Sequence, residues 1–162
     1  MRSFVAPELV NFQTIPRPAV FLAGSIDMGG AEDWQRVVTE ELADLPGSVL
    51  NPRRAAWDPS WPNDAQFKPF REQVTWELDG LDGADVVLVN FEADSKAPIS
   101  LLELGLHART KKVVVACPPA YWRHGNVQIT CERHAIPLFS TLSEALKLVQ
   151  DMVLAAARPS AA

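Results

Sequence analysis

The sequence predicts an α/β fold with a mainly parallel central sheet of about five strands and helices on both of its faces. Two observations lead to this fold class. Short apolar runs alternate along the 162 residues with longer segments of helical spacing, which is typical of parallel sheets. Residues 84–91 are apolar at positions of both faces, as expected for a central parallel strand. The length fits a single domain, which we place over 19–156.

The first third of the chain contains two of the expected strands. Residues 1–18 hold three prolines and are expected to form an irregular segment ahead of the domain. Residues 19–24 are a short apolar run that ends in glycine, which predicts a buried strand. A loop follows over 24–30, and helical spacing begins near residues 31–32. Residues 48–51 are expected to form a second short strand.

The middle of the chain combines a proline-rich loop with a helix and the most apolar strand. Residues 52–69 contain four prolines and two tryptophans. This composition predicts a long ordered loop or a lid, because flexible linkers seldom carry tryptophan. Residues 70–82 have helical apolar spacing, and Gly83 ends the helix ahead of the strand over 84–91.

The last third is expected to continue the same alternation. The expected elements are, in order, a helix over 99–109, a strand over 112–117, a loop over 118–126, a short strand or extended segment over 127–130, a last strand over 137–139 and a helix from 140 to about 156. Ser140 or Thr141, with Glu144 nearby, has the pattern of a capping box at the start of that last helix. Residues 157–162 are expected to be a disordered tail.

Composition and charge argue against several classes of partner. A net charge of −5 and a pI near 5.2 disfavour nucleic acid or an anionic membrane surface. No apolar run approaches the ~20 residues of a membrane span, and the first residues lack the apolar stretch of a signal peptide. The two cysteines make neither a disulfide framework nor a metal-ligand spacing. We therefore expect a cytoplasmic protein without a metal or a cofactor.

Ligands of such sheets bind outside the carboxyl ends of the strands. This rule points to four segments, 24–30, 51–62, 90–103 and 117–126, which should meet at one edge. In the first of them Gly24, Ser25 and Ile26 would offer backbone N–H groups to a ligand, although the string is neither a dinucleotide fingerprint nor a P-loop. A plain tight turn is an equally good interpretation, and Asp27 disfavours a phosphate there.

Two acidic residues are the main candidates for chemistry. Glu103 follows Ser100 at the spacing of a capping box, which is the simpler interpretation. Alternatively Glu103 lies in the first turn of a helix, where the helix dipole would keep it ionised as a nucleophile. Glu77 lies in the preceding helix next to Trp76, and could equally be a surface residue. His107, one turn past Glu103, could orient it, although helix packing is the more ordinary role.

The remaining candidates lie in loops. Arg53, Trp57 and Asp58 would form a wall over a ligand, with Trp57 stacking on a flat ring, or the loop is simply pinned by its own aromatic side chains. Asn90 ends the strand over 84–91, and Asp94 follows it, where it could contact ligand hydroxyls. Glu92 is a similar but weaker candidate, since acidic residues are also common in loops.

Taken together, four strings in this order and spacing resemble the nucleoside 2-deoxyribosyltransferase-like family. These strings are Phe21–Ile26, Asn51–Arg54, Trp76-Glu77 ahead of Ala84–Val86, and Ser100–Gly105. The resemblance covers about residues 19–145. It implies a flavodoxin-like, Rossmann-like three-layer sandwich and an enzyme that cleaves an N-glycosidic bond.

The resemblance also implies roles for individual residues. In the family a glutamate in the Glu-Leu-Gly string attacks the anomeric carbon of the deoxyribose, and that glutamate is Glu103 here. A covalent glycosyl-enzyme forms, and a second nucleobase or water then takes the sugar. The second acid of the family falls on Glu77, where an aspartate is more usual, and would hold and protonate the nucleobase. The expected ligands are a nucleoside and a free nucleobase, with Ser100 among the binding residues.

Three further expectations come from the resemblance. Phe21 stands where the family usually has a tyrosine, so that phenol is missing. Related deoxynucleotide hydrolases carry a basic residue in the glycine loop, whereas this chain has Asp27, which predicts a nucleoside without phosphate. Family sites are often completed by a neighbouring subunit, here by Tyr121, Trp122 or Asn126, which implies a homo-oligomer of two or more copies. Hydrolysis of a nucleoside or a deoxynucleoside 5′-monophosphate, and a non-catalytic binding module, stay open as alternatives.

Overall fold

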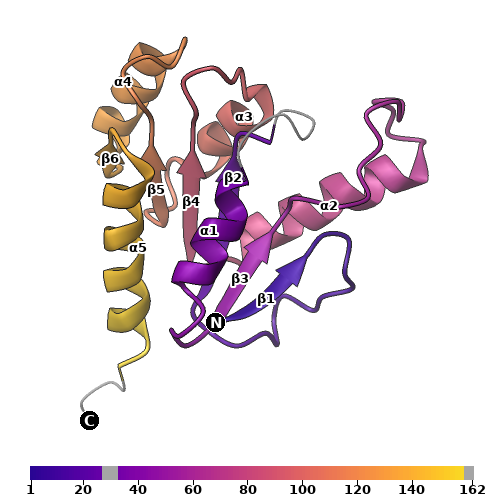
Figure 1. Ribbon diagram of the computed structural model, residues 1–162, viewed down its shortest axis with the longest axis horizontal. Helices are drawn as coiled ribbons and strands as arrows, with labels where there is room; N and C mark the ends of the chain where they lie inside the picture. The colour runs from indigo at the N-terminus through magenta and orange to yellow at the C-terminus, as the bar shows by residue number, and fades with distance from the viewer. Residues whose placement is uncertain (27–32, 159–162) are drawn as a thin grey trace.

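Six parallel strands form the central sheet of the computed structural model, which describes residues 1–26 and 33–158 (Figure 1). The strands are β1 (Arg2–Val5), β2 (Ala19–Gly24), β3 (Ser48–Asn51), β4 (Val86–Asn90), β5 (Val113–Ala116) and β6 (Leu138–Phe139). Their order across the sheet is β1-β3-β2-β4-β5-β6, and each neighbouring pair is parallel. Counted from β2, this is the 2-1-3-4-5 order of flavodoxin-like folds, so the predicted fold class is confirmed.

Five helices of the described residues cover the sheet on both faces (Figure 1). They are α1 (Trp34–Glu41), α2 (Lys68–Gly83), α3 (Pro98–His107), α4 (His124–His134) and α5 (Leu142–Ala156). None of these helices is long and apolar enough to cross a membrane, as far as the described ranges extend. Helix α5 is capped by Thr141, one of the two expected capping residues. The Thr141 hydroxyl accepts from the backbone N–H of Glu144 and donates to its carboxylate.

The core consists of two layers because neighbouring residues of a strand point to opposite faces of the sheet. Val20 and Leu22 of β2 pack with the side chains of α1 and α5. Phe21 and Ala23 of the same strand pack on the other face with α2, α3 and α4. The result is the predicted three-layer sandwich.

The N-terminal segment differs from the prediction. Residues 1–18 were expected to be irregular, but Arg2–Val5 form β1, which pairs with β3 and raises the strand number from about five to six. Only one side chain of this edge strand, Phe4, is buried. Its two apolar residues, Phe4 and Val5, are adjacent and do not alternate with polar ones, so the strand had no signal in the sequence.

The segment 127–130 also differs from the prediction. A short strand or an extended segment was expected, but these residues are part of α4. Its β-branched residues alternate with polar ones, which is a strand pattern. In the structure Val127 and Cys131 are buried on one side of the helix while Ile129 is exposed. Burial therefore follows the helical spacing i, i+4 rather than the alternation.

The strand order reverses between β2 and β4, and this reversal creates the edge at which ligands bind in such sheets. The last residues of the two strands, Gly24 and Asn90, are paired. Gly24 has a φ of +147°, and a Cβ there would collide with the carbonyl oxygen of Asn90. Glycine is therefore required at this position, where the chain turns into the site.

Candidate functional site

The glycine turn is tied to the ends of its neighbouring elements. The backbone N–H of Ser25 donates to the Asn90 carbonyl at 3.0 Å, and the buried Ser25 hydroxyl accepts from the N–H of Glu92 at 3.2 Å. The Ser25 carbonyl accepts from the indole of Trp34 at 2.9 Å. Through these bonds Ser25 links the end of β2 to the end of β4 and to α1. Ile26 follows half-buried, and Asp27 lies outside the described residues.

The structure brings the two acidic candidates together on the α2–α3 face of the sheet. Glu103 projects from α3 with 8% of its surface exposed, and Glu77 projects half-buried from α2. Burial raises the pKa of Glu103 to about 8, and the charge of Glu77 adds to the increase. Burial also raises the pKa of Glu77, while a hydrogen bond from Gln73 opposes the increase. The two carboxyl groups therefore influence each other's ionisation.

Two expectations about Glu103 were wrong. Helix α3 begins at Pro98 after Ala97, so Ser100 is its third residue rather than its cap, and the capping box does not form. Glu103 lies in the second turn, beyond the reach of the N-terminal partial charge. Burial then outweighs the dipole, and the carboxyl group holds a proton at neutral pH instead of being kept ionised.

His107 faces Asp82 and does not have the orienting role for Glu103 that was one of its two interpretations. Its Nε2 lies 3.9 Å from the Asp82 carboxylate on α2, and its Nδ1 is buried without a hydrogen-bond partner among the described residues. Burial lowers the pKa of His107, and the nearby Lys112 lowers it further. A neutral imidazole that packs between the two helices agrees with the ordinary structural role.

Gln73 is a residue of this site that the sequence interpretation missed. It lies on α2 one turn before Glu77 and is almost fully buried. Its Nε2 donates to the Glu77 carboxylate at 2.9 Å and to the Pro52 carbonyl at 2.8 Å. A glutamine four residues before a candidate acid was a usable signal, because residues at this spacing are neighbours on a helix.

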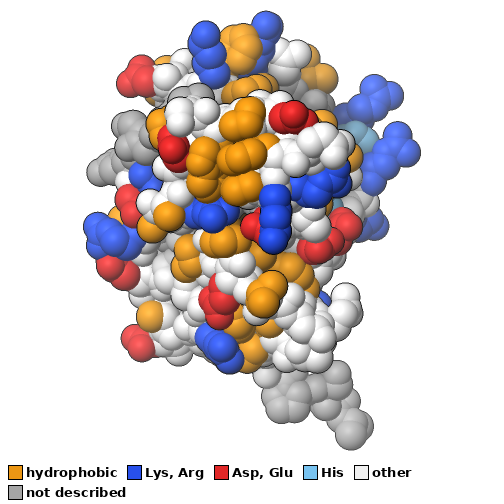
Figure 2. Space-filling view, turned by 90° about the vertical axis from the view of Figure 1, so that its right-hand side faces the viewer, with side chains coloured by type: hydrophobic (Ala, Val, Ile, Leu, Met, Phe, Trp, Pro, Cys, Tyr) orange, Lys and Arg blue, Asp and Glu red, His pale blue; other side chains and the backbone are white. Residues whose placement is uncertain are grey.

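The loop after β3 is held by contacts of its own side chains. Arg53 contacts residues at the start of α1, and the aromatic side chains contact one another. The Arg53 Nη1 donates to the Gln35 side chain at 3.2 Å, and its Nε lies 3.7 Å from the Asp33 carboxylate, so this residue links the end of β3 to α1. The Trp57 ring packs against Trp61 with centroids 5.2 Å apart. Figure 2 shows the side of the molecule toward which the first turns of α2 project in Figure 1. On this side hydrophobic side chains gather into a patch with charged groups around it.

Asp58 has a structural role in the same loop. Its carboxylate accepts from the backbone N–H and the hydroxyl of Ser60 at 2.9 and 2.7 Å, and these bonds lower the pKa of Asp58. The contacts of Trp57 and Asp58 fit the alternative of a loop pinned by its own side chains. They do not require a ligand.

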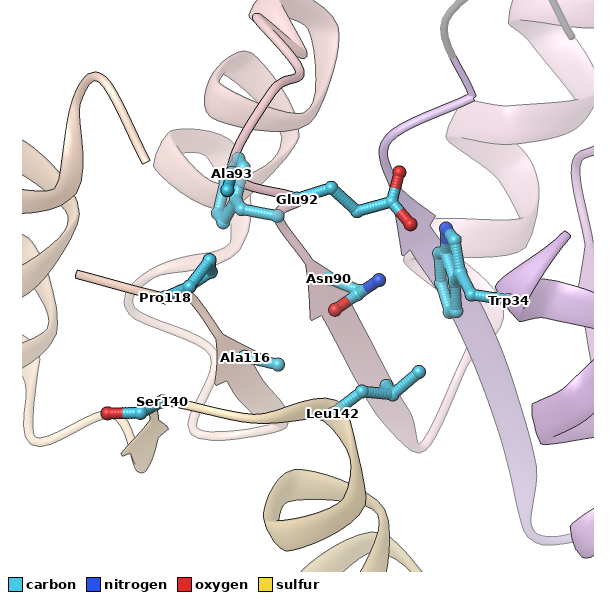
Figure 3. A pocket seen from close by; sticks show the side chains of 9 residues that line it. Trp34, Asn90, Glu92, Ala93, Ala116, Pro118, Ser140 and Leu142 are labelled. Atoms are coloured by element: carbon cyan, nitrogen blue, oxygen red, sulfur yellow. The ribbon is translucent and has the colours of Figure 1, made fainter. Parts of the chain in front are cut away.

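A separate pocket of about 280 Å³ lies at the carboxyl ends of β4 and β5, near the start of α5. Asn90, one of the candidates, is buried and points into it, and Glu92 and Trp34 stand at its side (Figure 3). Asp94 is exposed and does not line this pocket. Neither Glu77 nor Glu103 belongs to the lining, so the pocket, which adjoins α1 and α5, is a different place from the carboxyl pair on α2 and α3.

The three residues that were expected to reach a neighbouring subunit have different environments. Tyr121 is buried, its ring packs on Phe91 at 4.7 Å and its hydroxyl donates to the Lys96 carbonyl at 2.7 Å. It therefore belongs to the core of its own subunit, and the expectation was wrong for this residue. Trp122 and Asn126 are exposed and available to a partner.

A cysteine and a histidine lie close together after β5. Cys117 Sγ lies 3.5 Å from His124 Nδ1, a proximity that the sequence interpretation had not found. Cys117 is fully buried, and burial raises its pKa to about 12, so the thiol is not a nucleophile at neutral pH. Across residues 1–26 and 33–158, no group of three or more His, Cys, Asp and Glu side chains is arranged to hold a metal ion.

Comparison with known protein families identifies a match to the chain. Residues 17–121 match the family described as nucleoside 2-deoxyribosyltransferase like. No curated protein matches the chain. The matched range contains both carboxyl residues and the glycine turn.

Proposed function

The chain belongs to the nucleoside 2-deoxyribosyltransferase-like family, and from this premise we propose that it transfers the 2-deoxyribosyl group of a nucleoside from one nucleobase to another. One observation carries the proposal. Two carboxyl groups with raised pKa values, Glu77 on α2 and Glu103 on α3, lie close enough for the charge of Glu77 to raise the pKa of Glu103. Paired carboxyl groups whose environments separate their pKa values are the usual means of cleaving a glycosidic bond.

The first half of the proposed reaction forms a covalent intermediate. The Glu103 carboxylate attacks the anomeric carbon, and the bond from that carbon to the nucleobase nitrogen breaks. The bonding electron pair goes to the nucleobase, which takes a proton from Glu77. The pair therefore needs one proton in total. In the free protein burial favours this proton on Glu103. The step therefore requires the proton to move to Glu77 when the substrate binds, which leaves Glu103 ionised for the attack.

The second half reverses these steps with another nucleobase. A nitrogen of the acceptor base attacks the anomeric carbon and gives its proton to Glu77. The ester bond to Glu103 breaks, and the carboxylate is restored. If water replaces the acceptor base, the same intermediate is hydrolysed, which is the alternative function.

The substrate is proposed to be a nucleoside without a 5′-phosphate. This proposal depends on the negative charge of Asp27 in the glycine loop, which would repel a phosphate. Because Asp27 lies outside the described residues, the proposal rests on residue type.

The exposed face of α3 supports a homo-oligomer. Ile99, Leu102 and Leu106 are 57, 59 and 56% exposed and follow one another at the spacing i, i+3, i+7. They form an apolar stripe on the helix that carries Glu103, and exposed stripes of this kind are typical of interaction sites. We propose that a second copy of the chain covers this stripe.

The experiment that tests the function uses 2′-deoxynucleosides and their 5′-monophosphates, with and without a different free nucleobase. A new nucleoside that appears only with the free nucleobase supports transfer. Free base and free sugar without an acceptor would indicate hydrolysis, and preference for the monophosphates would contradict the inference from Asp27. The control is Glu103→Gln, which keeps the shape of the side chain and should show no turnover. Absence of turnover by the unaltered protein would favour a binding module.

A further inference from the structure

Gln73 is held by two acceptors at once. Its Nε2 donates to the Glu77 Oε1 at 2.9 Å and to the Pro52 carbonyl at 2.8 Å, and only 4% of its surface is exposed. Both partners are oxygen atoms, so the amide must present its NH₂ group to them. The contact with Pro52, which follows β3, fixes the amide and leaves its donor aimed at Glu77.

The two carboxyl groups receive different support from their surroundings. Burial acts on both, but only Glu77 accepts a hydrogen bond, whereas the Glu103 carboxyl group accepts none from the described residues. A donor to a carboxylate favours its ionised form.

Other charged groups come from the elements that adjoin Glu77. Glu103 on α3 raises the cost of a second negative charge. Arg53, which follows Pro52, is engaged by Gln35 and Asp33 towards α1, and the Arg54 guanidinium lies over the Trp61 ring at 4.9 Å. On α2 itself, Asp79 and Asp82 are exposed to solvent.

We propose that Gln73 is a positioning residue that keeps Glu77 ionised, so that the single proton of the carboxyl pair stays on Glu103 until a substrate binds. The consequence of this proton placement for catalysis rests on the proposed function. The placement of the proton is a property of the free protein and can be measured without turnover.

The experiment is a titration of the glutamate carboxyl carbons by ¹³C NMR, with signals assigned through Glu77→Gln and Glu103→Gln. The unaltered protein should show two coupled steps for the pair. In Gln73→Met, which keeps the volume but removes the donor, the lower step should move upward by about one to two pH units. The chain offers a matched control, because Gln128 donates to Glu132 at the same spacing and at 2.9 Å on the surface of α4. Gln128→Met should leave both steps unchanged.

An unchanged lower step in folded Gln73→Met would overturn the proposal and leave Gln73 as a link between α2 and Pro52. If that variant does not fold, Gln73→Glu keeps the length of the side chain and should also move the lower step upward. Where turnover is found, the acid limb of the kcat/KM profile should move with the titration, whereas a purely structural role would lower kcat/KM equally at every pH. A protein without turnover that shows the expected titration would contradict the proposed function and support this inference.

Discussion

Glu103→Gln should make the protein more stable above pH 5 while abolishing the proposed transferase activity. The ordinary pKa of a glutamate is near 4.5, and burial raises the value for Glu103 to about 8 in the folded chain. Between these values the unfolded chain has lost the proton and the folded chain keeps it. The free energy of unfolding therefore falls as the pH rises, by about 1.4 kcal/mol for each pH unit, and becomes constant above pH 8.

The magnitude follows from this interval. From pH 4.5 to pH 7 the loss amounts to about 3 kcal/mol, and to about 5 kcal/mol at pH 8 and above. These figures are upper bounds, because local opening lets water reach the charged form. Glutamine has no proton to lose, so the variant escapes this penalty while keeping the volume of the side chain.

The assay is urea unfolding of both proteins at pH 5, 7 and 9. The stability of the variant relative to the unaltered protein should grow from near zero at pH 5 to a few kcal/mol at pH 9. Glu41→Gln, at an exposed position of α1, is the control and should give a difference that does not grow in this way. A difference between the Glu103 variant and the unaltered protein that is the same at all three pH values would refute the reasoning.

Three other substitutions test separate parts of the structure. Gly24→Ala should destabilise the protein by more than about 2 kcal/mol in thermal unfolding, because its Cβ would meet the Asn90 carbonyl at a φ of +147°; a smaller effect would show that the turn relaxes. Glu77→Gln should slow cleavage by about 10²–10⁴-fold for nucleosides with ordinary bases. The loss should be much smaller for a deoxyriboside with an activated leaving group, because that group leaves without a proton. Equal losses for both substrates would exclude proton donation by Glu77. Leu102→Glu should dissociate the expected oligomer in sedimentation experiments, while Leu9→Glu, at an exposed residue outside α3, should not.

The sequence was sufficient for the parts of the fold that depend on local pattern. The strands β2, β4 and β5 are continuous apolar runs bounded by turn residues, and such runs indicate buried parallel strands without further information. The edge strand β1 had no such pattern because only Phe4 is buried. Helix α4 was missed because its β-branched residues imitate a strand, and only packing on the core selects the helical spacing.

The candidate acids followed from the sequence, but their ionisation did not. Glu77 and Glu103 were identified by their place in a pattern of strings. Whether each carries a proton depends on how far other elements exclude water from it, which no local pattern contains. The role of Gln73 has the same origin, since its second partner, Pro52, is 21 residues away in the chain.

The sequence by itself determined the alternation of strands and helices, the glycine turn after β2 and the order of the strings that identify the family. These features depend on residues that are close together in the chain. The tertiary structure alone decided that burial raises the pKa of Glu103, that Tyr121 is buried and that the pocket near Asn90 is separate from the carboxyl pair. Burial and electrostatic interaction depend on distances in space between segments that are far apart in the sequence, and folding sets those distances.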